Sequence, residues 1–121
     1  MKFIALIYGD ETSWETRSPE ERSKLIARYR SVTEEMRAAG VYADANQLTP
    51  TRDATSVRVR DAETLVVDGP YAEVKEALGG YYLLECDSLD DALDWAARIP
   101  AAEDGAVEVR PVYLDTAEEQ L

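Results

Sequence analysis

Lys2–Tyr8 reads KFIALIY and Gly80–Cys86 reads GYYLLEC, and each is an apolar run of strand length. A strand with one face in water alternates apolar and polar side chains, whereas these two runs are apolar on both faces. Strands of this kind lie at the centre of a sheet, with cover on each side. The two runs therefore predict a sheet whose middle strands are buried from both directions.

Two amphipathic helices are predicted beside these strands. SPEE at residues 18–21 combines an N-cap serine, a proline in the first turn and the glutamate of a capping box. Apolar residues then recur at helical spacing as far as Gly40, a residue type common just after a helix, which predicts a helix over about Pro19–Ala39. A second helix begins after Ser88, whose side chain can cap it, and ends before Pro100.

The remaining segments complete the order of strands and helices. The polar stretch Gly9–Arg17 predicts a loop. Further strands are predicted over Val41–Leu48, Thr55–Arg60, Thr64–Asp68 and Val107–Tyr113. The second and third of these are close enough along the chain to form a hairpin. This order predicts an α+β fold, a ferredoxin-like split βαβ with an antiparallel sheet and both helices on one face.

The apolar character of the sheet also predicts an assembly. Two helices cover only one face of a sheet, yet both central strands are apolar on the other face as well. A second copy of the chain, packed sheet against sheet, is the simplest cover, so we expect a homodimer. We expect residues 1–114 to form a single domain and Asp115–Leu121 to be a short acidic tail.

Composition and charge exclude several classes of function. The chain has 121 residues, no histidine and one cysteine, which excludes His-based triads, His–metal sites and thiolate zinc sites. The net charge of −12 argues against nucleic-acid binding, and no apolar run is long enough to cross a membrane. The single cysteine and the lack of a signal-peptide pattern predict a cytoplasmic protein.

The negative charge is concentrated in the second half of the chain. Residues 1–60 hold 10 basic and 9 acidic side chains, whereas residues 61–121 hold 3 and 16, a net charge of −13. This imbalance indicates a solvated acidic surface, or attraction between the two halves within one protomer or across a dimer. The aspartates over residues 87–94 lack the ligand spacing of a calcium loop and are typical of a helix N-terminus. We therefore expect no metal and no cofactor.

Asp68–Glu76, which reads DGPYAEVKE, is the densest group of chemically useful residues in the chain. Asp-Gly-Pro ends a strand abruptly, and an aromatic and three charged side chains follow within six residues. Two interpretations stay open for this segment. It is a loop folded over a ligand cleft, or it is a tight turn fixed by an Asp cap and a Lys–carboxylate pair.

Two pairs of residues are candidates for acid–base catalysis. Asp68 with Lys75 is the first pair, and Asp10 near Tyr8 is the second. Each combines a general base with an electrostatic partner, provided that the two groups are buried together. We take Asp68 and Lys75 as the catalytic candidates.

The ligand-binding candidates combine guanidinium groups with aromatic side chains. Strand arginines can hold a carboxylate or a phenolate through forked hydrogen bonds, and aromatic residues can wall a small cyclic ligand. Structural roles compete with this interpretation: Arg58 as an exposed sheet charge, Trp14 as a loop anchor and Cys86 as a buried strand residue. Tyr81 and Tyr82 are further aromatic walls, or belong to the core or the dimer interface. The ligand-binding candidates are Tyr8, Trp14, Arg58, Tyr71, Glu73 and Arg110.

The DGPYAEVKE segment resembles the DGPFAETKE motif of the YCII-related (YciI-like) family, in its DGPF branch, and differs at Tyr71 and Val74. The resemblance covers nearly the whole chain, because flanking segments match in the same order. These are the opening KFIALIYGDE with Trp14, then Gln47–Pro50, Ala54–Arg58, Gly79–Tyr82, Trp95–Pro100 and Val107–Val112. The resemblance implies a ferredoxin-like dimeric α/β barrel, in agreement with the burial argument.

The family resemblance implies little about chemistry. YCII-related proteins are mostly uncharacterised; a His–Asp pair in a cleft suggests an enzyme in one branch, and one relative is linked to dechlorination of a hydroxylated aromatic. This sequence has no histidine, so that pair is absent here. The DGPF branch is often encoded near alternative sigma factors, which implies a regulatory or stress-related setting.

Two hypotheses about function follow. The first is a small-molecule-binding or enzyme-like homodimer with a pocket between the helix-free sheet face and the Asp68–Glu76 loop. Its chemistry would be a carboxylate-based proton transfer or a lyase-type step on a small polar or aromatic compound. The second is a non-catalytic interaction or regulatory module whose acidic second half docks a basic partner.

Overall fold

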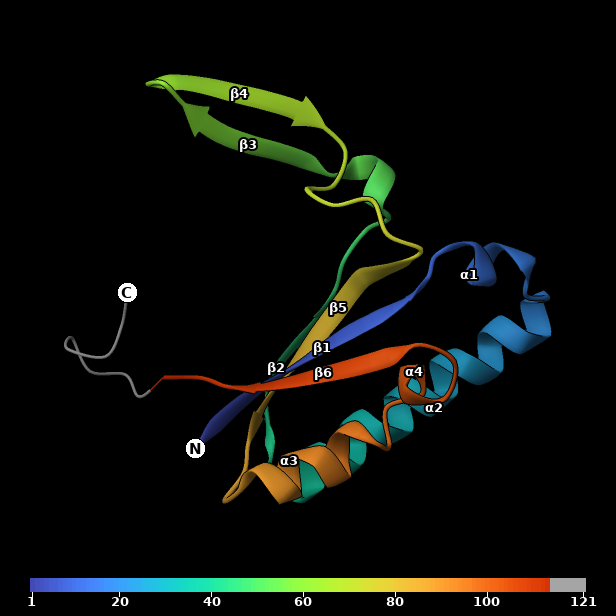
Figure 1. Cartoon of the computed structure of the whole chain (residues 1–121). Helices are drawn as coiled ribbons and strands as arrows, with labels where there is room; N and C mark the ends of the chain where they lie inside the picture. The colour runs from blue at the N-terminus through green and yellow to red at the C-terminus, as the bar shows by residue number, and fades with distance from the viewer. Residues whose placement is uncertain (114–121) are drawn as a thin grey trace.

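A computed structural model describes residues 1–113, and its elements follow the predicted order (Figure 1). The predicted acidic tail over Asp115–Leu121 lies outside the described residues. The elements are β1 (Lys2–Asp10), α1 (Thr12–Thr16), α2 (Pro19–Ala38), β2 (Tyr42–Gln47), η1 (Thr51–Asp53), β3 (Thr55–Arg60), β4 (Glu63–Asp68), β5 (Glu76–Glu85), α3 (Leu89–Ala96), α4 (Ala101–Asp104) and β6 (Ala106–Pro111).

Four of the strands form one antiparallel sheet in the order β2-β5-β1-β6. The two apolar runs that predicted central strands lie in β1 and β5, which are the middle pair; Phe3 faces Leu84 across it, and Ala5 faces Tyr82. Pro111 lies on the edge strand β6, where its missing N–H removes no internal ladder bond. The predicted α+β fold with an antiparallel sheet is therefore confirmed.

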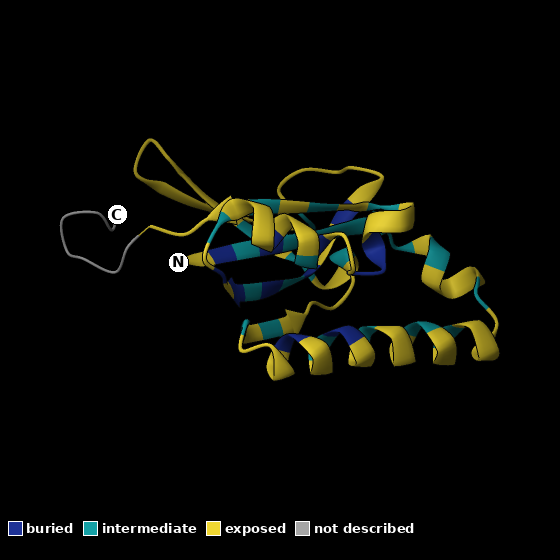
Figure 2. Cartoon of the chain, turned by 90° about the horizontal axis from the view of Figure 1, so that it is seen from below, coloured by how far each residue is buried: buried dark blue, intermediate teal, exposed yellow. Residues whose placement is uncertain are grey.

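The core lies between this sheet and the two longest helices. The predicted capping box of α2 is present: the Glu21 N–H donates to Ser18 Oγ, and the Ser18 N–H donates to Glu21 Oε1, both at 3.1 Å. Both helices lie on the same face of the sheet, and their buried residues pack against it (Figure 2). The largest fully buried side chains are Phe3, Met36, Leu84 and Ile99.

The opposite face of the sheet has no helix over it (Figure 1). Because side chains alternate along a strand, the half-buried Ile4, Leu6 and Tyr8 point away from the buried Phe3 and Ala5. Across the ladder, Ile4 stands beside Leu83 and Leu6 beside Tyr81, and these two residues of β5 are also half-buried. We call this group the uncovered face, and its members are Ile4, Leu6, Tyr8, Tyr81 and Leu83.

Polar side chains on the two edge strands border the uncovered face. On β2, the Tyr81 hydroxyl donates to Asp44 Oδ2 at 3.1 Å and accepts from Asn46 Nδ2 at 2.9 Å. On β6, Arg110 Nε pairs with Glu108 Oε2 at 3.2 Å. The uncovered face thus has an apolar centre and polar edges. Tyr82, the residue after Tyr81 in β5, points into the core instead. This agrees with the core role that the sequence left open for it beside a ligand-wall role.

β3 and β4 form a separate two-stranded sheet, so the predicted hairpin is confirmed, whereas the prediction of one sheet for all the strands is wrong. Figure 1 shows this hairpin standing clear of the four-stranded sheet, on the side away from α2 and α3. We call β3, β4 and the turn between them the arm. Its turn residues Asp61 and Ala62 have positive φ angles of 51° and 63°, as a tight hairpin turn requires.

The loop predicted over Gly9–Arg17 is wrong, because β1 continues to Asp10 and α1 occupies Thr12–Thr16. Local hydrogen bonds explain the difference: the Asp10 carboxylate accepts from the Thr12 N–H at 3.0 Å and from its hydroxyl at 2.7 Å. Neither α1 nor α4 is long enough to show helical periodicity in the sequence. Among residues 1–113, no helix is both long and apolar enough to traverse a bilayer.

Candidate functional site

The motif segment forms a loop that joins the arm to β5. β4 ends at Asp68 and β5 begins at Glu76, so residues 69–75 are irregular. The start of this loop is fixed to the base of the arm: the Gly69 N–H donates to the Ala54 carbonyl, and the Ser56 hydroxyl donates to the Gly69 carbonyl, both at 2.8 Å. Gly69 has a φ of +107°, which its missing Cβ permits.

Arg58 and Tyr71 are the two predicted ligand residues that the structure brings together. The guanidinium carbon of Arg58 lies 4.5 Å from the centre of the Tyr71 ring. The Tyr71 side chain is 76% exposed, and Arg58 has no ion-pair partner among residues 1–113. A cation stacked on an aromatic face with its N–H donors still open offers a carboxylate both a charge and a forked hydrogen bond.

Asp68 and Lys75 are not joined in the described chain. Asp68 is exposed at the end of β4, opposite Thr55, and forms no ion pair with Lys75. Lys75 lies instead near Asp10. The two hydrogen bonds from Thr12 are the main cause that lowers the pKa of the Asp10 carboxyl, and the charge of Lys75 adds a smaller effect. A proton-transfer role for Asp68 and Lys75 therefore needs a ligand, or a second chain, between them.

Trp14 has the features of an anchor. It lies on α1, where the Arg22 guanidinium carbon is 5.3 Å from its ring centre and Arg22 Nε donates to the Trp14 carbonyl at 3.0 Å. These contacts tie α1 to the first turns of α2 and favour the structural role among the two that the sequence left open. Tyr8 lies on the uncovered face, and Glu73 is exposed in the loop without a hydrogen-bond partner among the described residues.

Arg110 lies far from the loop within one chain. It pairs with Ile4 across the sheet, whereas Asp10 at the other end of β1 pairs with Glu76. Asp10 lies six positions beyond Ile4 along the strand, a distance of about 20 Å. The predicted ligand residues are therefore dispersed in one protomer: Arg58, Tyr71 and Glu73 lie on the arm and loop, Tyr8 on the uncovered face, Trp14 on α1, and Arg110 at the opposite end of the sheet.

Glu11 holds the base of the arm, a role that the sequence did not indicate. Its Oε1 accepts a hydrogen bond from the Thr51 N–H, and its Oε2 accepts one from the Thr51 hydroxyl, both at 2.7 Å. Thr51 begins η1, the single turn that leads into β3. The two residues are 40 positions apart, so no local spacing could reveal this contact.

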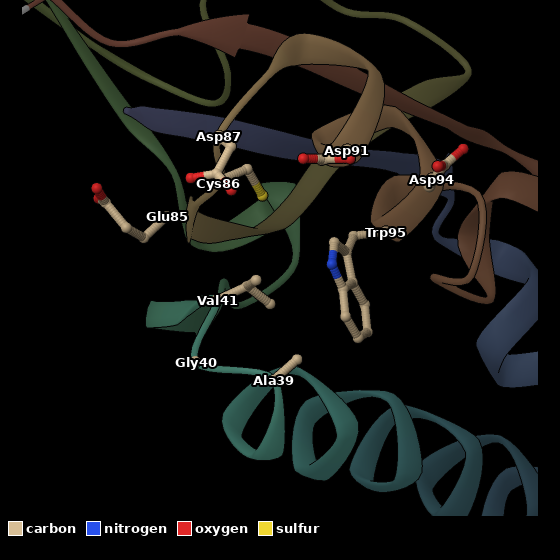
Figure 3. A pocket seen from close by; sticks show the side chains of 9 residues that line it. All are labelled: Ala39, Gly40, Val41, Glu85, Cys86, Asp87, Asp91, Asp94 and Trp95. Atoms are coloured by element: carbon tan, nitrogen blue, oxygen red, sulfur yellow. The ribbon is translucent and has the colours of Figure 1, made fainter.

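Two cavities lie on the helical side of the sheet, and no residue of the motif loop lines either of them. The first, about 310 Å³, is an acidic groove between the end of α2 and the start of α3 (Figure 3). Its acidic lining residues are Glu85, Asp87, Asp91 and Asp94. The second, about 390 Å³, lies between α2 and the segment around Arg98.

Cys86 faces the acidic groove and is 5% exposed (Figure 3). Burial is the main cause that raises the pKa of its thiol, and the negative charge of Asp91 adds to the effect. This burial confirms the interpretation of Cys86 as a buried residue, although β5 ends one residue before it, at Glu85; a raised thiol pKa makes it a weaker nucleophile. Within residues 1–113, no three metal-ligating side chains come together in a way that could hold an ion.

Comparison with known proteins adds one family and one relative. The family model for the YCII-related domain matches residues 1–115. An uncharacterised protein of Rhizobium meliloti (strain 1021) is 39% identical over 116 residues, which is 94% of each chain. The family match extends over the sheet, both long helices, the arm and the motif loop, so it covers every element described above.

Proposed function

The chain belongs to the family of YCII-related domains, and on this premise we propose that it acts as a homodimer that binds a small aromatic or polar molecule at the Asp68–Glu76 loop. The Arg58–Tyr71 pair is the observation that carries the ligand part of this proposal. The DGPYAEVKE segment supports placing the chain in the DGPF branch of the family, and its single cysteine supports a cytoplasmic location.

The uncovered face supports the homodimer. Stable interfaces combine an apolar, aromatic centre with a polar rim. Leu6, Tyr81 and Leu83 supply such a centre, and the side chains of the two edge strands supply the rim. Two copies related by a two-fold axis can cover this face on each other, which gives a dimeric α/β barrel. Such a barrel places a sheet surface beside the loop that one chain alone leaves open.

The Arg58–Tyr71 pair supports an aromatic carboxylate or phenolate as the ligand. The guanidinium group provides a fixed positive fork for the anionic group, and the Tyr71 ring provides an apolar plane for the ligand ring. Lys75, in the same loop, adds a second positive charge at the end nearer the sheet. A purely apolar ligand would leave both cations unused.

An enzymatic form of this proposal assigns a proton transfer to Asp68. For a bound aromatic 2-oxo acid, the Asp68 carboxylate removes the proton next to the carbonyl group, which yields an enolate and a carboxylic acid. The ammonium group of Lys75 stabilises the enolate, and return of the proton to carbon restores the ligand. Incubation in D₂O then replaces that C–H by C–D, and Asp68→Asn stops the exchange, whereas Glu63→Gln, at the other end of β4, leaves it unchanged.

Two measurements test the binding proposal. Sedimentation velocity at micromolar concentration measures the assembly, and a single 13.5-kDa species would contradict the homodimer.

Calorimetric titration with benzoate and 4-hydroxybenzoate measures the affinity for the ligand. We expect Arg58→Lys to weaken binding by about tenfold or more because the forked hydrogen bonds of the guanidinium group are lost. Arg60→Lys is the matched control on the same strand. Absence of binding by the dimeric wild type would overturn the ligand class.

The acidic groove favours a second candidate function, a docking surface for a basic partner in a regulatory setting. Glu85, Asp87, Asp91 and Asp94 surround the groove, within the half of the chain that carries a charge of −13. Binding by surface charges weakens strongly as salt rises, whereas binding in a closed pocket does not. Titration with poly-lysine at 20 and 300 mM salt (roughly fourfold different Debye lengths) therefore separates the two functions.

A further inference from the structure

We infer that the arm of each protomer packs across its partner through one of its two faces. This inference rests on the proposed homodimer and goes beyond it. It assigns a contact surface to the arm and leaves the other face, which carries Arg58, available to the ligand.

One face of the arm is an apolar surface without cover. In the register of the arm, Val57 stands opposite Val66 and Val59 opposite Thr64, so these four β-branched side chains share one face. Val57 and Val66 are each 65% exposed, and Val59 is 60% exposed. The other face differs, because it carries Arg58 and Arg60 beside its apolar residues. We call the first surface the valine face.

The arm lacks the support that a free hairpin needs. A two-stranded hairpin alone is marginal in water, and it becomes stable when a third element packs on it. All six residues of β4 are exposed, and the arm makes at most marginal contacts with the other described strands and helices. Its base is nevertheless held, because Glu11 binds Thr51 and Gly69 bonds to Ala54. The arm is thus oriented at its base and uncovered along its length.

A second copy of this chain is the occupant that the geometry favours. The arm stands on the side of the sheet away from the helices, which is the side of the uncovered face (Figure 1). A protomer seated on that face therefore lies next to the arm. A standard interface uses about 20–30 residues from each partner, far more than the few apolar side chains of the uncovered face. The arm provides the additional contact area, and two-fold symmetry doubles it.

The ligand site lies on the arm but outside this contact. The loop that carries Tyr71 leaves the arm directly at Asp68, and Arg58 belongs to the arm itself. Both residues are exposed in one chain, and neither described cavity includes them. Arg58 lies on the face opposite the valine face, so a partner seated on the valine face holds the arm in place and leaves the Arg58–Tyr71 pair accessible to a ligand.

The valine face provides a direct test. Val57→Thr with Val66→Thr keeps β-branched residues, so the arm still forms strands, but it replaces two apolar surfaces with polar ones. Two substitutions in each of two copies change four side chains in the dimer. We therefore expect the dissociation constant of the dimer to rise roughly a hundredfold in a sedimentation dilution series. Val67→Thr is the matched control, because Val67 is 62% exposed on the opposite face of the same strand.

Paramagnetic labelling tests the contact itself. A nitroxide is attached at Asp61→Cys in a Cys86→Ala background. This labelled protein is mixed with ¹⁵N-enriched protein that carries no nitroxide. The inference predicts broadening of sheet amides in the second copy. A monomeric wild type would overturn the homodimer as well as this inference. This inference alone would be overturned by an unchanged dimer dissociation constant in the valine-face variant. Broadening confined to the arm of the second copy would overturn it as well.

Discussion

Leu84 in β5 and Leu65 in β4 are both strand leucines, but Leu84 has no exposed surface, whereas Leu65 is 42% exposed. Leu84 belongs to the core cluster with Phe3 and Met36, between the sheet and the helices. Leu65 lies on the arm, where strand pairing is the main organising contact. The comparison shows that β-branched and aliphatic sequences form strands in both regions, while packing partners come from the chain itself in only one.

Leucine-to-alanine substitution gives the largest expected difference between the two regions. Leu84→Ala leaves a cavity in a closed core, so we expect the free energy of unfolding to fall by about 3 kcal/mol. Leu65→Ala removes a side chain that is already partly in water, and we expect a loss below about 1 kcal/mol. Urea denaturation of both variants at one protein concentration measures the difference, since a dimer's stability depends on concentration.

The same pair of variants can break the comparison. Equal losses for Leu84→Ala and Leu65→Ala would mean that the arm is as fully packed in solution as the core. One chain alone does not bury Leu65. Equal losses of unfolding free energy would therefore require that a partner buries both faces of the arm. That result would extend the dimer contact beyond the valine face.

The two glycines at the middle of β5 test how tightly the sheet itself is packed. A Cβ added at Gly80 would lie 2.8 Å from the Asn46 carbonyl oxygen of β2, too close for backbone that cannot move aside. We expect Gly80→Ala to lower the free energy of unfolding by about 2 kcal/mol. At Gly79 the nearest atom is the Ile7 carbonyl oxygen at 3.9 Å, so Gly79→Ala is the adjacent control with little effect. Thermal denaturation followed by circular dichroism compares them, and similar melting temperatures would contradict the close approach of β2.

The core region was largely predictable from the sequence because its signals are local. KFIALIY and GYYLLEC predicted the central strands, and the SPEE capping box predicted the start of α2; all three are observed. Periodicity, caps and apolar runs involve residues within one turn or one strand of each other. The loop predicted before α2 was wrong for the same reason, since the five-residue α1 is too short to carry a period.

The candidate site was predictable only in part because its contacts join distant residues. The sequence predicted Arg58 and Tyr71 as ligand residues, and in the structure the two side chains stack on each other. The sequence also predicted Arg110, which lies at the opposite end of the sheet. The pairing of Asp68 with Lys75 relied on their nearness along the chain, whereas the fold directs Lys75 toward Asp10. Residue types indicate which chemistry is available, but the register of the strands decides which groups meet.

Glu11 links the two regions, so its removal should affect the arm more than the core. Glu11→Ala deletes both acceptors of Thr51, and we expect the local opening free energy of the arm to fall by about 1–2 kcal/mol with little change in global unfolding. Hydrogen exchange of arm amides measured against core amides shows the difference. Glu15→Ala is the control, because the Glu15 side chain makes only an exposed ion pair with Arg52, at 3.8 Å. Equal acceleration in β1 and β5 would contradict an anchor that acts on the arm alone.

The turn of the arm gives the smallest expected effect and one with a definite sign. Ala62 has a φ of +63°, which glycine adopts without the steric cost that a Cβ adds, so we expect Ala62→Gly to stabilise the arm by about 0.5 kcal/mol. Ala54, at the other end of the arm, has a φ of −75°, and there glycine adds only flexibility to the unfolded chain. Ala54→Gly should therefore destabilise the arm by a similar amount. Exchange rates of the arm amides should move about twofold in opposite directions in the two variants. Changes of the same sign would mean that the turn relaxes to negative φ in solution, and the valine face would then lose the fixed geometry on which its contact with a partner depends.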